Sequence, residues 1–198
     1  MLEKIESSEK TLNENFITSH EVAVARPTNE SIVIEEATSD ELGGIAKLIS
    51  VQRDRQVSEI LPQLQQKLII SQREPAELQI FAATSGGKVV GYGKCEILKT
   101  KEIDGCVGMP QAWYLTGSIV APEYRRLGIG RRLCEARLAW IAKRADAVYY
   151  YTNVRNKGSI ALHKAFGFVE FSQDFTLPGH TFRRGKGVLF RAELEQAA

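Results

Sequence analysis

The segment from Ser118 to Leu133, SIVAPEYRRLGIGRRL, combines residue types and a spacing that suit the binding of a phosphorylated ligand. An apolar run stops at Pro122, and basic residues around a Gly-Ile-Gly turn then lead into an amphipathic pattern. The first N–H groups of a helix have no partner inside it, and the helix dipole adds positive charge there. Gly128 and Gly130 let a ligand approach the main chain closely. Planar guanidinium groups that suit phosphate oxygens come from Arg125, Arg126, Arg131 and Arg132.

Two common phosphate-binding loops do not fit this segment. A P-loop needs Lys-Ser or Lys-Thr after its last glycine, whereas two arginines follow Gly130. A dinucleotide-binding fingerprint needs a third glycine at the position that Leu133 occupies. What remains is Arg-x-x-Gly-x-Gly, formed by Arg125, Gly128 and Gly130. The alternative interpretation is a surface turn before a basic helix.

The pattern resembles the acyl-CoA pyrophosphate loop of the GNAT superfamily of N-acetyltransferases, [Gln/Arg]-x-x-Gly-x-[Gly/Ala]. A second family segment lies downstream: an Asn after the fifth strand, a short helix, and an ending like Leu-Tyr-x-x-x-Gly-Phe. The resemblance covers roughly 31–194 and is clearest over 113–171. The matching residues, in the family's order and at about its spacing, are Asn156, Ser159, Leu162-His163 and Gly167-Phe168.

The resemblance implies acetyl-CoA as co-substrate. The pantetheine arm would bond to main chain at the end of one strand, as an added strand does, and the loop N–H groups would hold the pyrophosphate. Asn156 would bond the pantetheine arm or nearby backbone, or alternatively only cap the short helix. The expected cofactor-binding residues are Ile119, Val120, Arg125, Arg126, Leu127, Gly128, Ile129, Gly130, Arg131, Asn156 and Ser159.

The family's chemistry is direct attack of an amine on the thioester. At pH 7 about one alkyl amine in 2,000 is neutral, so a base or a desolvating pocket is needed. A backbone N–H near Val120 would meet the oxyanion. His163 stands where the family has its proton-donating Tyr, and Tyr114 where several members have a Glu base. Glu96, on the preceding strand, is the nearest carboxylate, unless it only faces solvent; a water relay is the other route. The candidate catalytic residues are therefore His163, Tyr114 and Glu96.

Composition excludes several other classes. The chain has 198 residues, 43% hydrophobic and 25% charged, which is ordinary for one soluble domain. No apolar run approaches the roughly 20 residues that span a bilayer, and the polar start MLEKIESSEK is no signal peptide. Three cysteines without a Cys-x-x-Cys pair make zinc or disulfides unexpected and a cytoplasmic location the default. No basic face interleaved with aromatic residues suggests nucleic acid, and no metal is indicated.

Hydrophobic periodicity predicts the elements that position these residues. Residues 1–29 show no sustained pattern and form a flexible or loosely docked extension, which could support a homodimer, cover the site or do neither. We expect the acetyltransferase domain to span 30–198. We expect an α/β (α+β) fold with a mixed, mostly antiparallel sheet and helices on both faces. Strands are expected at 31–37, 78–83, 89–98, 113–120, 147–154, 168–175 and 187–194, and helices at about 38–49, 61–71, 128–144 and 158–166.

The sequence thus predicts an acetyl-CoA-dependent N-acetyltransferase acting on a primary amine of a small molecule in a ternary complex. Four acidic residues could attract a cationic amine such as an aminoglycoside or a polyamine, but scattered surface acids are equally consistent with no such role. These residues are Glu96, Glu102, Asp104 and Asp174. Two alternatives stay open. One is a protein N-terminal or lysine acetyltransferase, which needs an open groove. The other is a non-catalytic acyl-CoA-binding sensor, suggested by the missing Tyr and the missing strand carboxylate.

Overall fold

A seven-stranded sheet in the order β1-β2-β3-β4-β5-β7-β6 forms the centre of the structure. The computed structural model describes residues 32–73, 76–182 and 185–195. Every neighbouring pair of strands is antiparallel except β4 and β5, which run parallel, so the predicted sheet type is confirmed. The strands are β1 (Ile32–Glu36), β2 (Leu78–Ser85), β3 (Lys88–Leu98), β4 (Ala112–Val120), β5 (Ala147–Asn153), β6 (Val169–Ser172) and β7 (Gly187–Glu193).

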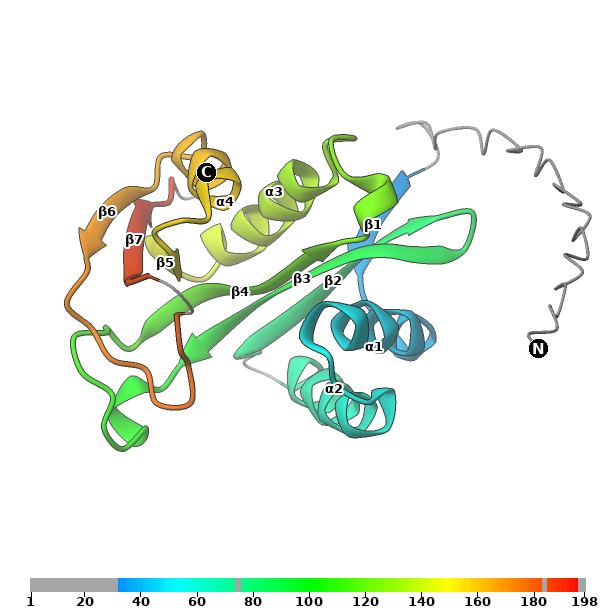
Figure 1. Ribbon diagram of the computed structural model, residues 1–198, viewed down its shortest axis with the longest axis horizontal. Coiled ribbons are helices and arrows are strands. Elements are labelled where there is room, and N and C mark those ends of the chain that lie inside the picture. Colours follow the sequence, from blue (N-terminus) through cyan, green and yellow to red (C-terminus); the bar gives the residue numbers. More distant parts are fainter. Residues whose placement is uncertain (1–31, 74–75, 183–184, 196–198) are drawn as a thin grey trace, which may run out of the picture.

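Helices cover both faces of the sheet, as predicted. Helices α1 (Ser39–Arg53) and α2 (Val57–Ser71) lie on one face, and α3 (Ile129–Ala142) and α4 (Lys157–Lys164) on the other (Figure 1). Short 3₁₀ turns, η2 (Thr100–Glu102) and η3 (Pro122–Tyr124), follow β3 and β4. None of the helices within the described ranges is both long and apolar enough to cross a membrane. The predicted extension at 1–29 lies outside the described residues.

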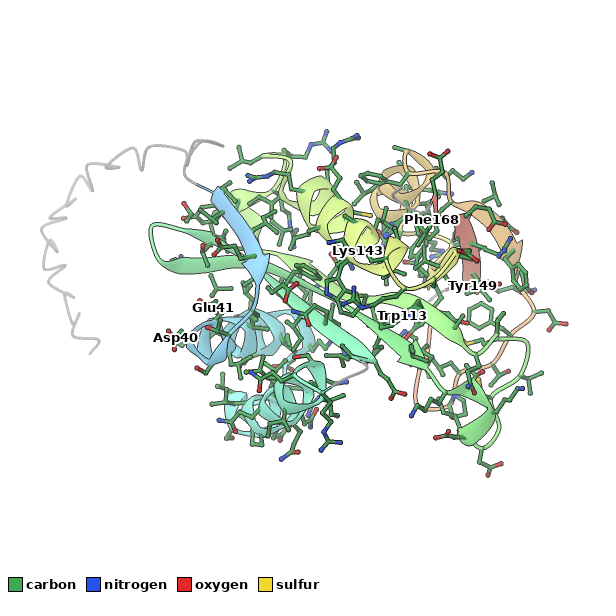
Figure 2. The ribbon with its side chains drawn as sticks, turned by 180° about the vertical axis from the view of Figure 1, so that it is seen from behind. Asp40, Glu41, Trp113, Lys143, Tyr149 and Phe168 are labelled. Carbon is green, nitrogen blue, oxygen red and sulfur yellow. The ribbon has the colours of Figure 1, made fainter. Side chains whose placement is uncertain are left out.

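A capping box starts helix α1. The Glu41 carboxylate accepts the backbone N–H of Thr38 at 2.8 Å, and Thr38 Oγ1 accepts that of Asp40 at 3.3 Å. Asp40 and Glu41 also add negative charge to the helix N-terminus (Figure 2). Thr38 is therefore the N-cap, and α1 starts at the next residue, Ser39.

The core has two main layers, one on each face of the sheet. Ile45, Leu64 and Ile80 are buried between the sheet and α1/α2, whereas Leu133 and Phe190 are buried on the α3 face. The buried stripe of α3 carries a charged residue, Arg137, at its centre. The residues that α3 buries are Ile129, Leu133, Cys134, Arg137 and Ile141.

The sheet opens in its middle. The parallel strands β4 and β5 share one register position, Tyr114 opposite Tyr149. Further along, β4 bulges: Thr116 pairs with Lys94 and Ile119 with Tyr92, so two residues of β4 face one of β3. The strands therefore separate over the second half of β4, which leaves a gap between their backbones.

Helix α1 packs closely on strand β3, and two adjacent glycines test this packing. A Cβ at Gly44 would lie 2.6 Å from Val89 Cβ, whereas a Cβ at Gly43 would meet nothing within 4 Å. We expect Gly44→Ala to lower the free energy of unfolding by about 1–3 kcal/mol through overpacking. Gly43→Ala should raise it by about 0.5–1 kcal/mol through helix propensity. Urea unfolding of both variants checks this, and equal effects would contradict the close packing.

Candidate active site

A cavity of about 440 Å³ lies where β4 and β5 separate, and we call it the gap cavity. Residues 115–118 of β4 and 150–153 of β5 line its two sides. Asn156, Ser159 and His163 line it from α4 and the turn before it. The structure thus brings together three of the residues that the sequence singled out near the expected thioester.

Asn156 has the structural role that the sequence left as its alternative. Its Oδ1 accepts the backbone N–H of Ser159 at 3.3 Å and so caps α4. Its Nδ2 donates to Thr152 Oγ1 at 3.2 Å, which ties the helix start to the end of β5. Asn156 lines the gap cavity even though it caps α4. Its contact with a ligand stays a prediction.

The glycine-bearing segment after β4 forms a second hollow of about 350 Å³, the loop cavity. Gly128 precedes α3 with φ 77°, and no side chain caps this helix. The first N–H groups of α3 therefore lack a cap and can meet an anion. The predicted residues that line the loop cavity are Val120, Arg125, Arg126, Gly128, Ile129, Gly130 and Arg131.

The four arginines of the motif have different surroundings. Arg125 Nε donates to the Val120 carbonyl at 3.2 Å, and Arg131 Nε contacts Glu135 at 3.0 Å. Arg126 has φ 67°, a conformation that costs energy for a residue with a side chain. Arg132 Nη1 donates to the Ile32 carbonyl at 3.0 Å on strand β1. Three arginines thus line the loop cavity, and Arg132 instead joins α3 to the edge of the sheet.

Ile119 and Leu127 do not line either of these cavities. The Ile119 side chain packs in the layer under α1 and α2, so only its main chain is available to the predicted ligand. The N–H of Ala121 bonds to the carbonyl of Val90 on β3. Because adjacent residues of a strand point their backbone groups to opposite edges, the N–H of Val120 faces the gap.

His163 is buried, and its hydrogen bond fixes the position of its proton. Its Nδ1 lies 2.8 Å from the Ser159 carbonyl oxygen, which can only accept, so Nδ1 carries the proton and Nε2 is an acceptor. Burial lowers the pKa of His163 to about 4, so the ring is neutral at pH 7. In this tautomer the ring offers the gap cavity no proton, and its predicted catalytic role stays untested.

Tyr150 was not predicted to act in the site. Its ring stacks on His163 at 3.7 Å and on Phe190 at 5.0 Å. Its buried hydroxyl has no hydrogen-bond partner with acceptable geometry among the described residues, although the Ser159 side chain lies near it. Burial raises the pKa of Tyr150 to about 12, so the phenol keeps its proton. Strand alternation points the Tyr150 side chain toward α4, where its ring contacts His163, and the neighbouring Tyr149 toward the other face.

A third cavity, of about 220 Å³, lies on the opposite face between the sheet and helices α1 and α2, and we call it the acceptor cavity. It shares several lining residues with the gap cavity, so the two meet at the bulge of β4. A side chain at Gly117 would be strained, because φ is 53° and a Cβ would press on the Tyr92 hydroxyl at 3.0 Å. The shared residues are Arg53, Thr116, Gly117, Tyr151 and His180.

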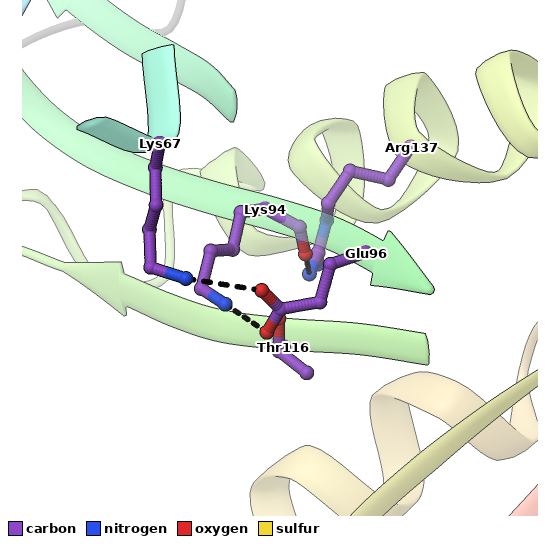
Figure 3. A network of polar contacts seen from close by, with 5 residues as sticks. All are labelled: Lys67, Lys94, Glu96, Thr116 and Arg137. Carbon is purple, nitrogen blue, oxygen red and sulfur yellow. Dashed lines mark hydrogen bonds and ion pairs between the residues drawn. The ribbon is translucent and has the colours of Figure 1, made fainter. Parts of the chain in front are cut away.

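Glu96 lines the acceptor cavity but is held by cations (Figure 3). Its carboxylate bonds to the ammonium of Lys94, to Lys67 Nζ at 3.2 Å and to Thr116 Oγ1 at 2.8 Å. Burial alone would raise the pKa of Glu96, but the two lysines and these hydrogen bonds outweigh burial and lower it to about 2. So weak a base does not suit the predicted role of accepting a proton from an amine.

Tyr114, the other predicted candidate, is not brought to the site. Its side chain is fully buried, and its hydroxyl donates to the Pro110 carbonyl at 2.8 Å. Its ring stacks on Tyr149 at 5.5 Å, and it lines neither the gap cavity nor the acceptor cavity. The structure therefore gives Tyr114 a packing role at the point where β4 and β5 still pair.

Arg137 is the second residue that sequence analysis missed. It is 1% exposed, and its Nε donates to the Leu133 carbonyl at 2.9 Å. Its Nη1 donates to the Lys94 carbonyl at 3.4 Å, and its Nη2 has no partner among the described residues. The guanidinium passes under Gly93, where a Cβ would lie 3.0 Å from Cζ. It forms part of the wall of the gap cavity.

Comparison with known proteins decides the family. The model of the Acetyltransferase (GNAT) family matches residues 45–168, which is more than half of the chain. The chain belongs to the GNAT family. It is therefore an acetyltransferase enzyme, and the earlier resemblance is confirmed. A search of the curated proteins finds no match.

Solved structures share the GNAT fold at low sequence identity. A ribosomal-protein-alanine N-acetyltransferase from Brucella melitensis has a TM-score of 0.64 at 22% identity, covering 82% of this chain and 99% of the other. The Escherichia coli protein of that type has a TM-score of 0.58 at 18% identity, covering 84% and 96%. A spermidine N-acetyltransferase chimera from Vibrio cholerae and hSSAT has a TM-score of 0.58 at 17% identity, covering 82% and 95%.

The ion pair of Glu96 in this GNAT protein predicts a stability effect that depends on pH. Burial lowers the pKa of Lys94 to about 8, and Glu96 partly opposes this, so the pair is charged between about pH 2 and 8. We expect Glu96→Gln to lower the free energy of unfolding by about 2–4 kcal/mol at pH 6. The loss should be smaller at pH 9.5. At that pH Lys94 has lost its proton in the folded wild-type protein, although the unfolded chain keeps it up to pH 10.5, so Glu96 no longer has the Lys94 charge to attract.

Urea unfolding at the two pH values measures this effect. Glu77→Gln is the matched control, because Glu77 pairs with Lys99 at 2.9 Å on the surface and each side chain is 43% exposed. The control should change stability by less than about 1 kcal/mol at either pH. An equal loss for Glu96→Gln at pH 6 and 9.5 would show that the Lys94 charge is not the cause.

Proposed function

We propose that this GNAT enzyme transfers an acetyl group from acetyl-CoA to a primary amine of a small molecule, by direct attack in a ternary complex. One observation carries the proposal: the gap cavity and the acceptor cavity meet at Thr116 and Gly117 from opposite faces of the sheet. A thioester in the one and an amine in the other would react at the bulge. The small acceptor cavity favours a small molecule over a protein segment.

The acetyl-CoA site follows the divergence of the strands. The pantetheine arm would lie between β4 and β5 and bond to the main chain at Val120, as an added strand does. The pyrophosphate would meet the uncapped N–H groups of α3 between Gly128 and Arg131. Arg125 and Arg126 would add positive charge at the rim of the loop cavity.

The bulge supplies the most suitable place for the oxyanion. Gly117 and Ser118 together face one residue of β3, so the regular ladder is interrupted there. An N–H freed from the ladder can donate to the oxygen that becomes negative in the tetrahedral intermediate. This position lies two to three residues before Val120, near which the sequence predicted the donor.

The acceptor cavity itself would activate the amine. Ammonium ions lose stability near other cations and away from water, so their pKa falls. Arg53, Lys67 and Lys94 line the cavity. The neutral, nucleophilic form of a bound amine is therefore favoured, and its proton can leave to solvent without Glu96 acting as the base.

Tyr150 is the better placed donor of a proton to the leaving thiolate. Its hydroxyl is protonated and free of hydrogen-bond partners with acceptable geometry in the described structure, and it lines the gap cavity. His163 would hold the Tyr150 ring in place by stacking at 3.7 Å. Transfer of the phenolic proton to sulfur would give free CoA, and solvent would restore the phenol.

The function is tested by calorimetric titration with acetyl-CoA, followed by a thiol-release assay over small amines and peptides. We expect one-to-one binding of acetyl-CoA, no binding of NAD, and acetyl transfer to at least one small amine. Transfer to peptides alone would replace the small-molecule acceptor with a protein. Tight binding with no thiol release from any acceptor would favour the acyl-CoA sensor.

Gly130→Asp separates cofactor binding from folding. A Cβ at Gly130 would lie 3.7 Å from Leu162 Cδ2, an ordinary contact, and an acidic side chain suits the first turn of a helix. The added carboxylate would repel the pyrophosphate at the start of α3. We expect the Kd for acetyl-CoA to rise at least about 10-fold, about 1.4 kcal/mol, with no loss of stability. Gly130→Ala is the control and should bind normally, because the GNAT pattern accepts Ala at this position; wild-type affinity of Gly130→Asp would contradict the loop assignment.

Tyr150→Phe tests the proton donor. We expect kcat to fall about 100-fold, in the range of general acid catalysis, while unfolding stability is kept because the hydroxyl has no partner to lose. Tyr149→Phe, the neighbour on the opposite face, should keep wild-type turnover. His163→Asn should lower kcat less than Tyr150→Phe does. The reverse order would assign the donor to His163, as the sequence predicted.

A further inference from the structure

The acceptor cavity has an excess of positive charge. Lys67 comes from α2 and Lys94 from β3, while Arg53 and Arg55 lie at and just after the end of α1. Glu96 is the single carboxylate among the described residues that line this cavity. The excess remains after every ion pair of the described structure has been counted.

These charges differ in how they are neutralised. Arg55 pairs with Glu59 at 3.3 Å, and both lysines share the carboxylate of Glu96. Arg53 has no carboxylate partner among the described residues, and it lines both the acceptor cavity and the gap cavity. Within the described part of the chain, Arg53 is thus available to bind an anion, close to the bulge where the amine would react.

The same arrangement argues against a polycationic acceptor. Glu96, which the sequence offered as an attraction for such amines, is already bound to two ammonium groups. Glu102, Asp104 and Asp174 line neither the acceptor cavity nor the gap cavity. An aminoglycoside or a polyamine would therefore bring further cations to a cation-rich wall.

We propose that the acceptor amine also carries an anionic group, a carboxylate or a phosphate, which Arg53 binds with the help of Lys67. The planar guanidinium suits either group through two parallel hydrogen bonds. With its anion held at Arg53, the acceptor would direct its amine toward Thr116 and Gly117. This inference rests on the proposed function, and it narrows the substrate class to anionic amines.

Matched pairs of acceptors test the charge preference. Amino acids are compared with their primary amides, 2-aminoethyl phosphate with ethanolamine, and spermidine is added, with thiol release measured under saturating acetyl-CoA. We expect kcat/KM for the anionic member of at least one pair to exceed that of its neutral partner 10-fold or more. A preference within the amino acid pairs would identify the anionic group as a carboxylate, and a preference for 2-aminoethyl phosphate would identify it as a phosphate. A preference for spermidine or for the neutral members would overturn the proposal.

Arg53→Gln tests the residue. It should lower kcat/KM for the preferred anionic amine at least 10-fold more than for its neutral partner, because losing one of the cations that activate the amine affects both members alike. Lys99→Gln is the control, because it removes a cation that pairs with Glu77 outside both cavities. Equal losses for both members of the pair, or no loss for either, would rule out recognition of the anion by Arg53.

Binding of the same compounds to the CoA-bound protein is measured by calorimetry, independently of turnover. Selective binding of the anionic members that Arg53→Gln abolishes would support this inference even without acetyl transfer, and would overturn only the proposed function. If the acids bind no more tightly than their amides, the inference is wrong, whatever the protein acetylates.

Discussion

The early separation of β4 from β5 is the constraint on which the rest of the site depends. Two parallel neighbours in the middle of a seven-stranded sheet share one register position and then diverge. Backbone N–H and C=O groups away from water need partners, so an open seam inside a sheet requires water or an extended ligand. The flanking strands keep the seam open, because β5 pairs with β7 over its whole length and β4 with β3.

The helices that follow β4 and β5 lie at the two ends of the gap between these strands. After β4 the chain turns through η3 and the glycine-bearing loop into α3, whose N-terminus has no side-chain cap. After β5 the chain enters α4, which Asn156 caps and which carries His163 against Tyr150. In the proposed complex, the nucleotide end and the reactive end of acetyl-CoA would lie at consecutive helix starts on one face, while the acceptor cavity opens on the other.

Local patterns were sufficient to predict most of the fold. Alternating apolar residues gave the strands, and the glycine-arginine loop with the Asn156 segment led to the GNAT family, which the family model confirms. The start of α2 was placed four residues late, at Leu61, one residue before a proline that the helix includes.

The site was harder to predict because its partners are distant in sequence. Glu96 looks like a free base until Lys67, 29 residues away, and Lys94 bind it. Tyr114 lies on the expected strand, but its hydroxyl already donates a hydrogen bond to the Pro110 carbonyl. Arg137 gave a readable signal, since it falls four residues after Leu133 in an otherwise apolar stripe. A charge at the centre of a buried helix face indicates a cavity or an unusual partner.

Hydrogen–deuterium exchange with and without acetyl-CoA reports on the backbone groups between β4 and β5, where the cofactor is expected to bind. We expect slower exchange on binding over Gly117–Val120 of β4 and over Ile129–Arg131 at the start of α3. Strand β2, which pairs on both edges, should show no change. Saturating acetyl-CoA that protects neither segment, or protects another part of the sheet, would contradict the placement of the cofactor between β4 and β5.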